Sequence, residues 1–144
     1  MFKKIAVVCS ETPEASRALA SAIHLAKLVG AELQVVMLMQ ELPAYTAFAS
    51  AADSSLTQTL LEDRSQYYGQ LQADALKTAL REGVASVTNL LEGEGVEVVL
   101  DFLAKKKPDL LVVGLHRHTS HISRLWNTVF ELAQDAPCSV LGVH

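Results

Sequence analysis

The sequence predicts an α/β fold in which a single domain, residues 1–144, is built on an open, parallel five-stranded sheet with helices on both faces. Short apolar runs rich in β-branched residues alternate with longer segments of helical periodicity along the whole chain. Strands that alternate with helices form βαβ units with right-handed crossovers, and such units make parallel sheets. The length of 144 residues suits one domain with a substantial core, and we find no linker and no internal duplication.

The first half of this pattern begins with a short apolar strand at residues 5–9. A helix should follow, because Thr12 can cap its first turn and Pro13 suits the first helical position. Gly30 should end that helix as a C-terminal cap. A second buried strand is then predicted at residues 33–39.

The middle of the chain predicts a loop and then a long helix. Residues 41–55 have no clear period and are rich in Ala and Ser, and loops of this length often cover a ligand or a partner surface. Residues 56–82 show helical periodicity, so we expect a helix there. Five residues should lie on its core face: Leu61, Tyr68, Leu71, Ala75 and Ala79.

The second half repeats the alternation. We expect strands at residues 86–91, 110–113 and 138–143, and helices at residues 96–107 and 122–136. Lysines 105–107 close the first of these helices, where cations interact favourably with the negative helix end, so they need not form a nucleic-acid surface. The core face of the last helix should include Leu132 and Ala133.

Composition excludes several classes of protein. Half of the residues are hydrophobic and 19% are charged, which excludes a disordered chain. The formal net charge is −4, and because phosphate groups attract basic surfaces, we expect no binding to nucleic acid or to membrane surfaces. No apolar stretch approaches the roughly 20 residues of a transmembrane helix, so we expect a cytoplasmic protein with no membrane span.

Two segments are candidates for a ligand site. In open parallel sheets, ligands bind beyond the carboxyl ends of the strands, where the strand order reverses. Ser10 and Thr12 follow the first strand, and residues 114–120 follow the fourth and open a helix whose N-terminus favours an anion. Arg117 would add a planar, charged donor for phosphate. The same residues also suit a plain helix cap in a polar loop, and spacing alone favours that plainer interpretation.

Metal binding and catalysis have weaker signals. His116, His118 and His121 have a spacing that allows chelation, but the segment lacks acidic and thiol partners, so a solvated loop is the favoured interpretation. Cys9 and Cys138 lie in apolar runs and are interpreted as reduced core thiols. We find no nucleophile elbow, no Walker loop and no zinc-protease motif, and therefore expect no enzymatic activity.

The chain resembles a known protein family. The resemblance covers the whole chain in the order and length of its elements, and it is carried by these stretches: residues 4–8 followed by 12–16, residues 109–114 with His116, and residues 135–141. The chain is similar to the universal stress proteins, a Rossmann-like α/β family in which some members bind ATP. The resemblance also implies a homodimer formed through the last strand. Val140, Leu141 and Val143 make that strand apolar, and unpaired sheet edges readily pair with other chains.

The resemblance further implies which residues would contact ATP. Nucleotide-binding members have a Gly, two residues, a Gly, nine residues, then a Gly followed by Ser or Thr, and an Asp at the end of the first strand. Gly114 and Thr128 match this pattern, whereas Arg117, Asn127 and Ser10 stand where it has the other two glycines and the Asp. Glycines let phosphate approach bare backbone, so we expect ATP binding to be weakened or lost.

Two hypotheses about function follow. The first is a non-enzymatic stress-response or regulatory protein that acts as a homodimer, with a protein partner that the sequence does not identify and no firm cofactor. The alternative is a module that binds an adenine nucleotide, ATP or AMP, through an altered phosphate loop, with slow ATP hydrolysis. The candidate nucleotide-binding residues are Ser10, Thr12, Gly114, His116, Arg117, His118, Thr119, Ser120, Asn127 and Thr128.

Overall fold

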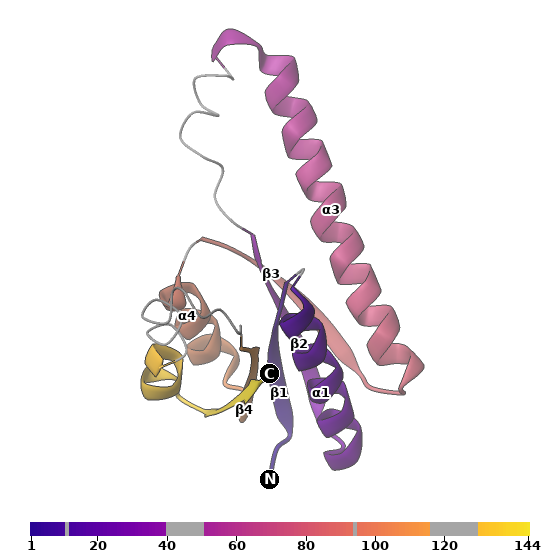
Figure 1. Ribbon diagram of the computed structural model, residues 1–144, viewed down its shortest axis with the longest axis vertical. Coiled ribbons are helices and arrows are strands. Elements are labelled where there is room, and N and C mark those ends of the chain that lie inside the picture. Colours follow the sequence, from indigo (N-terminus) through magenta and orange to yellow (C-terminus); the bar gives the residue numbers. More distant parts are fainter. Residues whose placement is uncertain (11, 40–50, 94, 116–129) are drawn as a thin grey trace.

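The computed structural model of the chain describes residues 1–10, 12–39, 51–93, 95–115 and 130–144 (Figure 1). Its elements are, in order, β1 (Lys4–Cys9), α1 (Pro13–Val29), β2 (Glu32–Met39), α3 (Ser54–Arg81), β3 (Ser86–Glu92), α4 (Val96–Lys106), β4 (Leu110–Gly114) and β5 (Ser139–Val143). Residues 130–135 are also helical.

The five strands form one parallel sheet in the order β3-β2-β1-β4-β5. This confirms the predicted fold class. The central strand β1 pairs with β2 on one side and with β4 on the other, so that Ile5 lies opposite both Leu33 and Leu110. The strands β2 and β3 extend the sheet on one side of β1, and the later strands β4 and β5 extend it on the other side. The strand order therefore reverses between β1 and β4.

Two apolar cores, one on each face of the sheet, hold the helices in place. Ile5 and Val7 point into the core under α1 and α3, whereas Ala6 points into the core under α4. All three side chains are fully buried. Because both faces of the sheet are covered, β1 is a continuous apolar run rather than an alternating one.

The ends of α1 are those that the sequence predicts. The hydroxyl of Thr12 accepts a hydrogen bond from the backbone N–H of Ala15 at 3.2 Å, and Pro13 occupies the first helical position. Gly30 adopts a left-handed conformation with φ 69°, and its N–H donates to the carbonyl of Ala26. Local capping rules thus fix the helix that follows the central strand.

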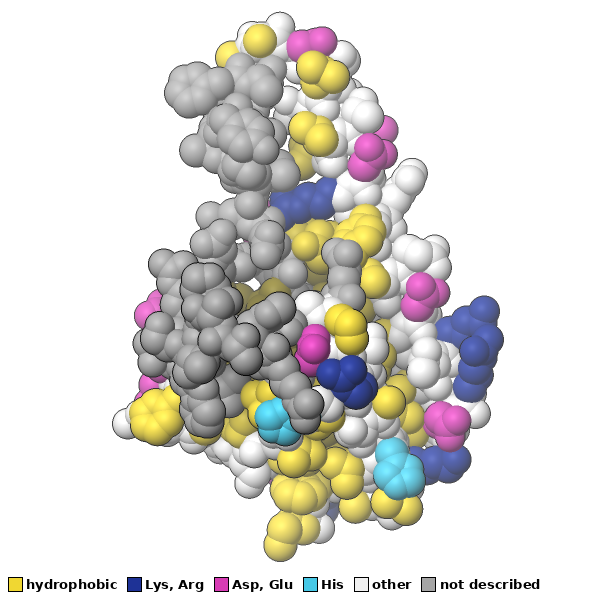
Figure 2. Space-filling model, in the orientation of Figure 1, with side chains coloured by type: hydrophobic (Ala, Val, Ile, Leu, Met, Phe, Trp, Pro, Cys, Tyr) yellow, Lys and Arg dark blue, Asp and Glu magenta, His cyan; other side chains and the backbone are white. Residues whose placement is uncertain are grey.

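The helix α3 begins earlier and packs over a shorter length than expected. Asp53 is the N-cap of α3, which begins at Ser54, and residues 51 and 52 are also helical, so the predicted loop is wrong at residues 51, 52, 54 and 55; residues 40–50 lie outside the described part. Only Ala75 and Ala79 are buried in it, near its C-terminal end. Leu61 is 48% exposed, so its predicted place on the core face is wrong. Figures 1 and 2 show this part of α3 projecting past the sheet, with hydrophobic side chains at the surface near its tip.

Two smaller differences concern the end of the chain and the cysteines. Leu132 is buried as predicted, whereas Ala133 is exposed because it lies on the outer side of the helical residues 130–135. Cys9 and Cys138 are free thiols, as predicted, but each is only partly buried.

None of the helices in the described part of the chain is long and apolar enough to span a bilayer.

Candidate functional site

The candidate site lies where β1 and β4 end beside each other. Ser10 directly follows β1, and its hydroxyl lies 3.3 Å from the hydroxyl of Thr12. Gly114 ends β4, the neighbouring strand. The strand-order reversal between β1 and β4 is the place where open α/β sheets bind ligands. The structure thus brings the described members of the predicted site, Ser10, Thr12 and Gly114, to one end of the sheet.

Gly114 has a packing role that sequence reasoning missed. A β-carbon at this position would lie 2.6 Å from the carbonyl carbon of Glu14 and 2.8 Å from the backbone nitrogen of Ala15. Those distances are well below van der Waals contact, and the atoms concerned are backbone. Gly114 therefore allows the end of β4 to pack directly against the first turn of α1.

A cavity of about 230 Å³ opens at the end of β1 and β2, beneath α3. Its lining consists of Cys9, Ser10, Thr12, Met37, Leu38, Tyr68 and Leu71. This volume lies below the roughly 300–1,000 Å³ of pockets that enclose drug-sized ligands. The cavity therefore suits one ring or one short chain of a ligand, with hydroxyl groups on one side and apolar side chains below.

An adjoining hollow of about 360 Å³ extends the site between α1 and α3. It shares Cys9, Ser10 and Leu71 with the first cavity. Its other lining residues are Ser16, Leu19, Tyr67, Asp74, Ala75 and Thr78. Ser10 thus lies at the boundary of two hollows rather than at the edge of one.

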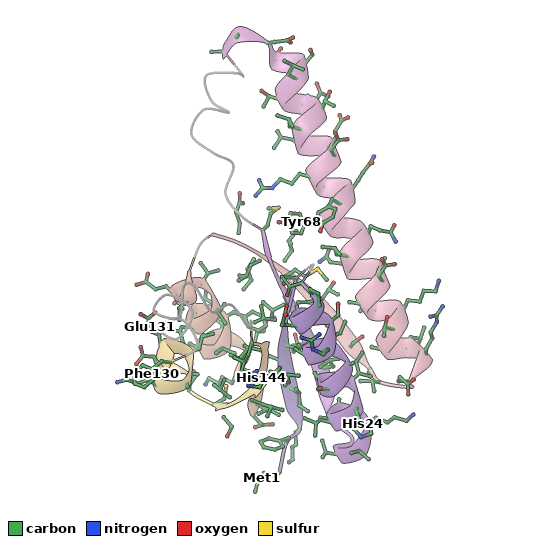
Figure 3. The ribbon with its side chains drawn as sticks, viewed as in Figure 1. Met1, His24, Tyr68, Phe130, Glu131 and His144 are labelled. Atoms are coloured by element: carbon green, nitrogen blue, oxygen red, sulfur yellow. The ribbon has the colours of Figure 1, made fainter. Side chains whose placement is uncertain are left out.

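The aromatic residues of α3 are only partly buried: Tyr67 is 38% exposed, and Tyr68 is half-buried. The rings of Tyr67 and Tyr68 meet edge to face, with centroids 5.3 Å apart and an interplanar angle of 76°, which is a favoured aromatic geometry. Tyr68 lines the smaller cavity, and Figure 3 shows it beside the end of the sheet. Its ring offers an aromatic wall to a ligand in that cavity.

Cys9 also lines both hollows, but its thiol is a weak nucleophile. Burial raises the pKa of the Cys9 thiol, and burial likewise is the main cause of a raised pKa at Cys138. A raised pKa keeps the thiol protonated near neutral pH, and the protonated form is a poor nucleophile. Cys9 therefore contributes an apolar surface to the site rather than a reactive group.

Most of the predicted phosphate-binding segment lies outside the described residues. This applies to His116, Arg117, His118, Thr119, Ser120, His121, Asn127 and Thr128. Among the residues that the structure does describe, no three His, Cys, Asp or Glu side chains are grouped to hold a metal ion.

The predicted dimer surface forms one edge of the sheet. Val140 packs against the core under α4, and Val143 packs against the core under α1 and α3. Leu141 is 37% exposed. The strand is held to its own subunit by Arg17, whose Nε donates to the carbonyl of His144 at 2.8 Å. Of the three predicted interface residues, Leu141 therefore presents the exposed apolar side chain.

Sequence reasoning missed three residues as lining residues of the smaller cavity: Met37, Leu38 and Leu71. Met37 and Leu38 were assigned only to a strand, although their place at its carboxyl end was a signal. Leu71 was assigned to the core face of α3.

Comparisons with known proteins agree with this architecture. The chain is 28% identical to a universal stress protein of Methanocaldococcus jannaschii over 144 residues, covering 99% of this chain and 82% of that protein. The solved structure of universal stress protein UspA from Lactobacillus plantarum superposes with a TM-score of 0.78 at 17% identity, covering 99% of this chain and 98% of that one.

Two further solved structures contain nucleotides. A universal stress protein in complex with cAMP has a TM-score of 0.74 at 20% identity, covering 99% of this chain and 97% of that one. The Archaeoglobus fulgidus protein in complex with dAMP has a TM-score of 0.67 at 15% identity, covering 100% of this chain and 98% of that one. The model of the universal stress protein family matches residues 1–144. The chain therefore belongs to the universal stress protein family.

Proposed function

We propose that this protein is a non-enzymatic, cytoplasmic regulator of the stress response that acts as a homodimer and has weakened or lost ATP binding. The observation that carries this proposal is the end of β1. Ser10 stands there, with its hydroxyl 3.3 Å from that of Thr12. This pair lacks the negative charge of the carboxylate that usually helps to hold the Mg²⁺ ion of a bound triphosphate, so it would hold that ion more weakly.

The edge of the sheet supports the dimer. The strand β5 pairs with β4 on one side only, so its outer edge leaves backbone N–H and C=O groups for a second chain. Leu141 is exposed on this strand. A two-fold axis beside the strand would bring two copies of the same edge together, which is the self-complementary contact that most homodimers use.

The cavity favours a second function, the binding of an adenine nucleotide. Its apolar residues Met37 and Leu71 and the ring of Tyr68 suit the faces of a base, and the hydroxyls of Ser10 and Thr12 suit its polar edge. Structurally similar family members were solved with cAMP and dAMP. These observations support a nucleotide with a single phosphate rather than ATP.

Titration calorimetry with ATP, AMP and adenosine, with and without Mg²⁺, tests the nucleotide part of the proposal. We expect ATP to bind no more tightly than AMP and Mg²⁺ to have no effect. The triple variant Ser10→Asp, Arg117→Gly, Asn127→Gly should gain Mg²⁺-dependent ATP binding. Micromolar binding of Mg·ATP to the natural chain, lost in Arg117→Glu, would contradict the proposal, as would release of phosphate from ATP.

Light scattering coupled to gel filtration, over a range of protein concentrations, tests the dimer. We expect a dimer that Leu141→Asp converts to a monomer. Val87→Asp is the matched control, because Val87 is 50% exposed on β3, the strand at the opposite edge. A natural chain that remains monomeric, or equal dissociation in both variants, would overturn the assignment to β5.

A further inference from the structure

The strand β3 forms the edge of the sheet opposite β5 and pairs, among the described strands, only with β2. Just before β3, the carbonyl of Ala85 accepts a hydrogen bond from the N–H of Leu33 on β2 at 3.0 Å. Successive residues of a strand direct their backbone groups to opposite sides, and the pairing with β2 continues without interruption. The backbone groups of Thr88 and Leu90 therefore point outward, and nothing in the described part of the chain bonds to them.

A groove of about 500 Å³ runs beside this edge, between β3 and α4, and is larger than either hollow at the end of β1. Its lining consists of residues 89–92 of β3 and, from α4, Val98, Asp101, Phe102, Lys105 and Lys106. Leu91 and Phe102 belong to the core under α4 and give the groove an apolar floor. Its strand residues advance about 10 Å, so the groove accommodates about three residues of an extended chain.

Charges divide the groove into an acidic and a basic end. Because residues 93–95 connect β3 to α4 and both elements line the groove, α4 runs back along β3. Glu92 therefore lies at one end of the groove, whereas Lys105 and Lys106 lie at the other. The ion pairs among the described residues involve neither lysine. Asp101 lies one helical turn before Lys105 and repels acidic groups from the middle of the groove, so an acidic partner group fits only at the lysine end.

We propose that β3 and this groove bind an extended peptide of a partner protein, which joins the sheet as a further strand antiparallel to β3. The charges set the direction, because an antiparallel chain places its carboxyl end beside Lys105 and Lys106 and its amino end beside Glu92. Antiparallel pairing is also slightly more stable than parallel pairing. Hydrogen bonds to the backbone of Thr88 and Leu90 supply affinity, and alternate apolar side chains in the groove supply specificity. The partner segment therefore alternates apolar and polar residues and ends in an acidic one.

The probe for this surface is a fluorescently labelled synthetic peptide of seven residues, the length of β3. It begins with lysine, alternates valine with threonine, and ends with aspartate and a free carboxyl group. Fluorescence anisotropy should show that it binds the full chain. A peptide with aspartate first and an amidated lysine last should bind about tenfold more weakly, because partly exposed charge pairs contribute modestly. Amide exchange followed by NMR should slow at Thr88 and Leu90 when the probe binds.

Two sets of variants separate the contributions of the edge and of the charges. Leu90→Pro removes an outward N–H, a change that an edge strand tolerates, so it should abolish binding, whereas Leu90→Ala should retain most of it. The double variant Lys105→Glu, Lys106→Glu should reverse the preference between the two peptides. Lys77→Glu with Arg81→Glu is the matched charge control, because both residues are exposed on α3 and neither lines the groove. Circular dichroism checks that each variant is folded.

Three results would contradict the proposal: no binding of the probe, equal binding of the two peptides, or undiminished binding to Leu90→Pro. These results leave the proposed dimer and nucleotide binding untouched, because those functions involve β5 and the end of β1. Light scattering of Leu90→Pro gives a fourth outcome. If this variant is monomeric and the natural chain is dimeric, a second copy occupies the edge and the assignment to a partner peptide is wrong.

Discussion

The two halves of α3 differ in what they contribute to the molecule. The C-terminal half belongs to the core: Ala75 and Ala79 are buried, and the amide of Gln72 donates to the hydroxyl of Thr88 on β3 at 3.2 Å. The N-terminal half exposes Leu56, Leu60 and Leu61 by 58%, 49% and 48%. One continuous helix therefore combines a part that packs in the core with a part whose leucines are exposed.

Helix length accounts for this difference. The 28 residues of α3 span about 42 Å, whereas the longest strand has 8 residues and spans about 26 Å. The helix cannot pack against the sheet over its whole length. Among the described residues, the projecting half of α3 has no fully buried side chain, and Leu56, Leu60 and Leu61 are exposed there.

The largest expected effect is that of a charge in the packed half. Ala79→Asp places a carboxylate at a fully buried position, and we expect it to lower the free energy of unfolding by about 3 kcal/mol or more. Leu60→Asp, the matched change in the projecting half, should stay within about 0.5 kcal/mol of the natural chain. Urea denaturation followed by circular dichroism measures both. Comparable losses would show that the two halves do not differ.

Removal of the Arg64 guanidinium, whose Nη2 is buried without a hydrogen-bond partner among the described residues, should have the next largest effect. In the absence of ligand, Arg64→Met should raise the free energy of unfolding by about 1 kcal/mol, because it removes a buried donor without an acceptor. Arg81→Met, which replaces an exposed arginine at the last position of the helix, should change it by less than about 0.5 kcal/mol. Thermal unfolding without nucleotide provides the measurement. A clear loss of stability in Arg64→Met would mean that the guanidinium already has a partner.

Gly69 lies between the two halves and offers a smaller gain. A β-carbon at this position would meet no atom within 4 Å, and glycine inside a helix is less stable than alanine by roughly 0.5–1 kcal/mol. Gly69→Ala should therefore stabilise the chain by about that amount and slow hydrogen exchange in the projecting half. Exchange mass spectrometry can follow both halves at once. Unchanged exchange there would show that Gly69 does not limit the stability of this segment.

Lowering the pH should change the stability of the two ends of α3 differently, and we expect this change to be the smallest of those described here. Hydrogen bonds from Ser55 lower the pKa of Asp53, and Lys27 at 2.9 Å lowers the pKa of Glu82. A carboxyl whose pKa is lower in the folded state stabilises that state above its ordinary pKa. The contribution is lost as the pH falls through the folded-state value.

Circular dichroism and urea midpoints between pH 7 and pH 3 test this difference. Asp53→Ala removes the N-cap of α3, so it should reduce helix content at pH 7 and leave the urea midpoint in place, because it affects only the projecting end. Glu82→Gln should lower the midpoint slightly at pH 7 and flatten its dependence on acid. A shift of the midpoint in Asp53→Ala would mean that the projecting end unfolds together with the core.

The parts of the fold that local rules determine were predictable from the sequence. The apolar run at β1, the cap at Thr12 and the stop at Gly30 fix β1 and α1 without reference to the rest of the chain. Leu61 was misplaced because periodicity identifies a face of a helix but not how far the sheet extends beneath it. Met37 and Leu38 were missed as site residues because the cavity that they line is made by three separate elements, which no local pattern describes.

The close contact between Gly114 and the backbone of Glu14 and Ala15 affects how this residue should be interpreted in related sequences. Any side chain there would push the start of α1 away from the central strands. Selection for a sound scaffold alone would keep this glycine after all affinity for nucleotides had disappeared. A glycine at the position of Gly114 in a related sequence is therefore no evidence that the related protein binds a nucleotide. That conclusion should depend on residues at other positions.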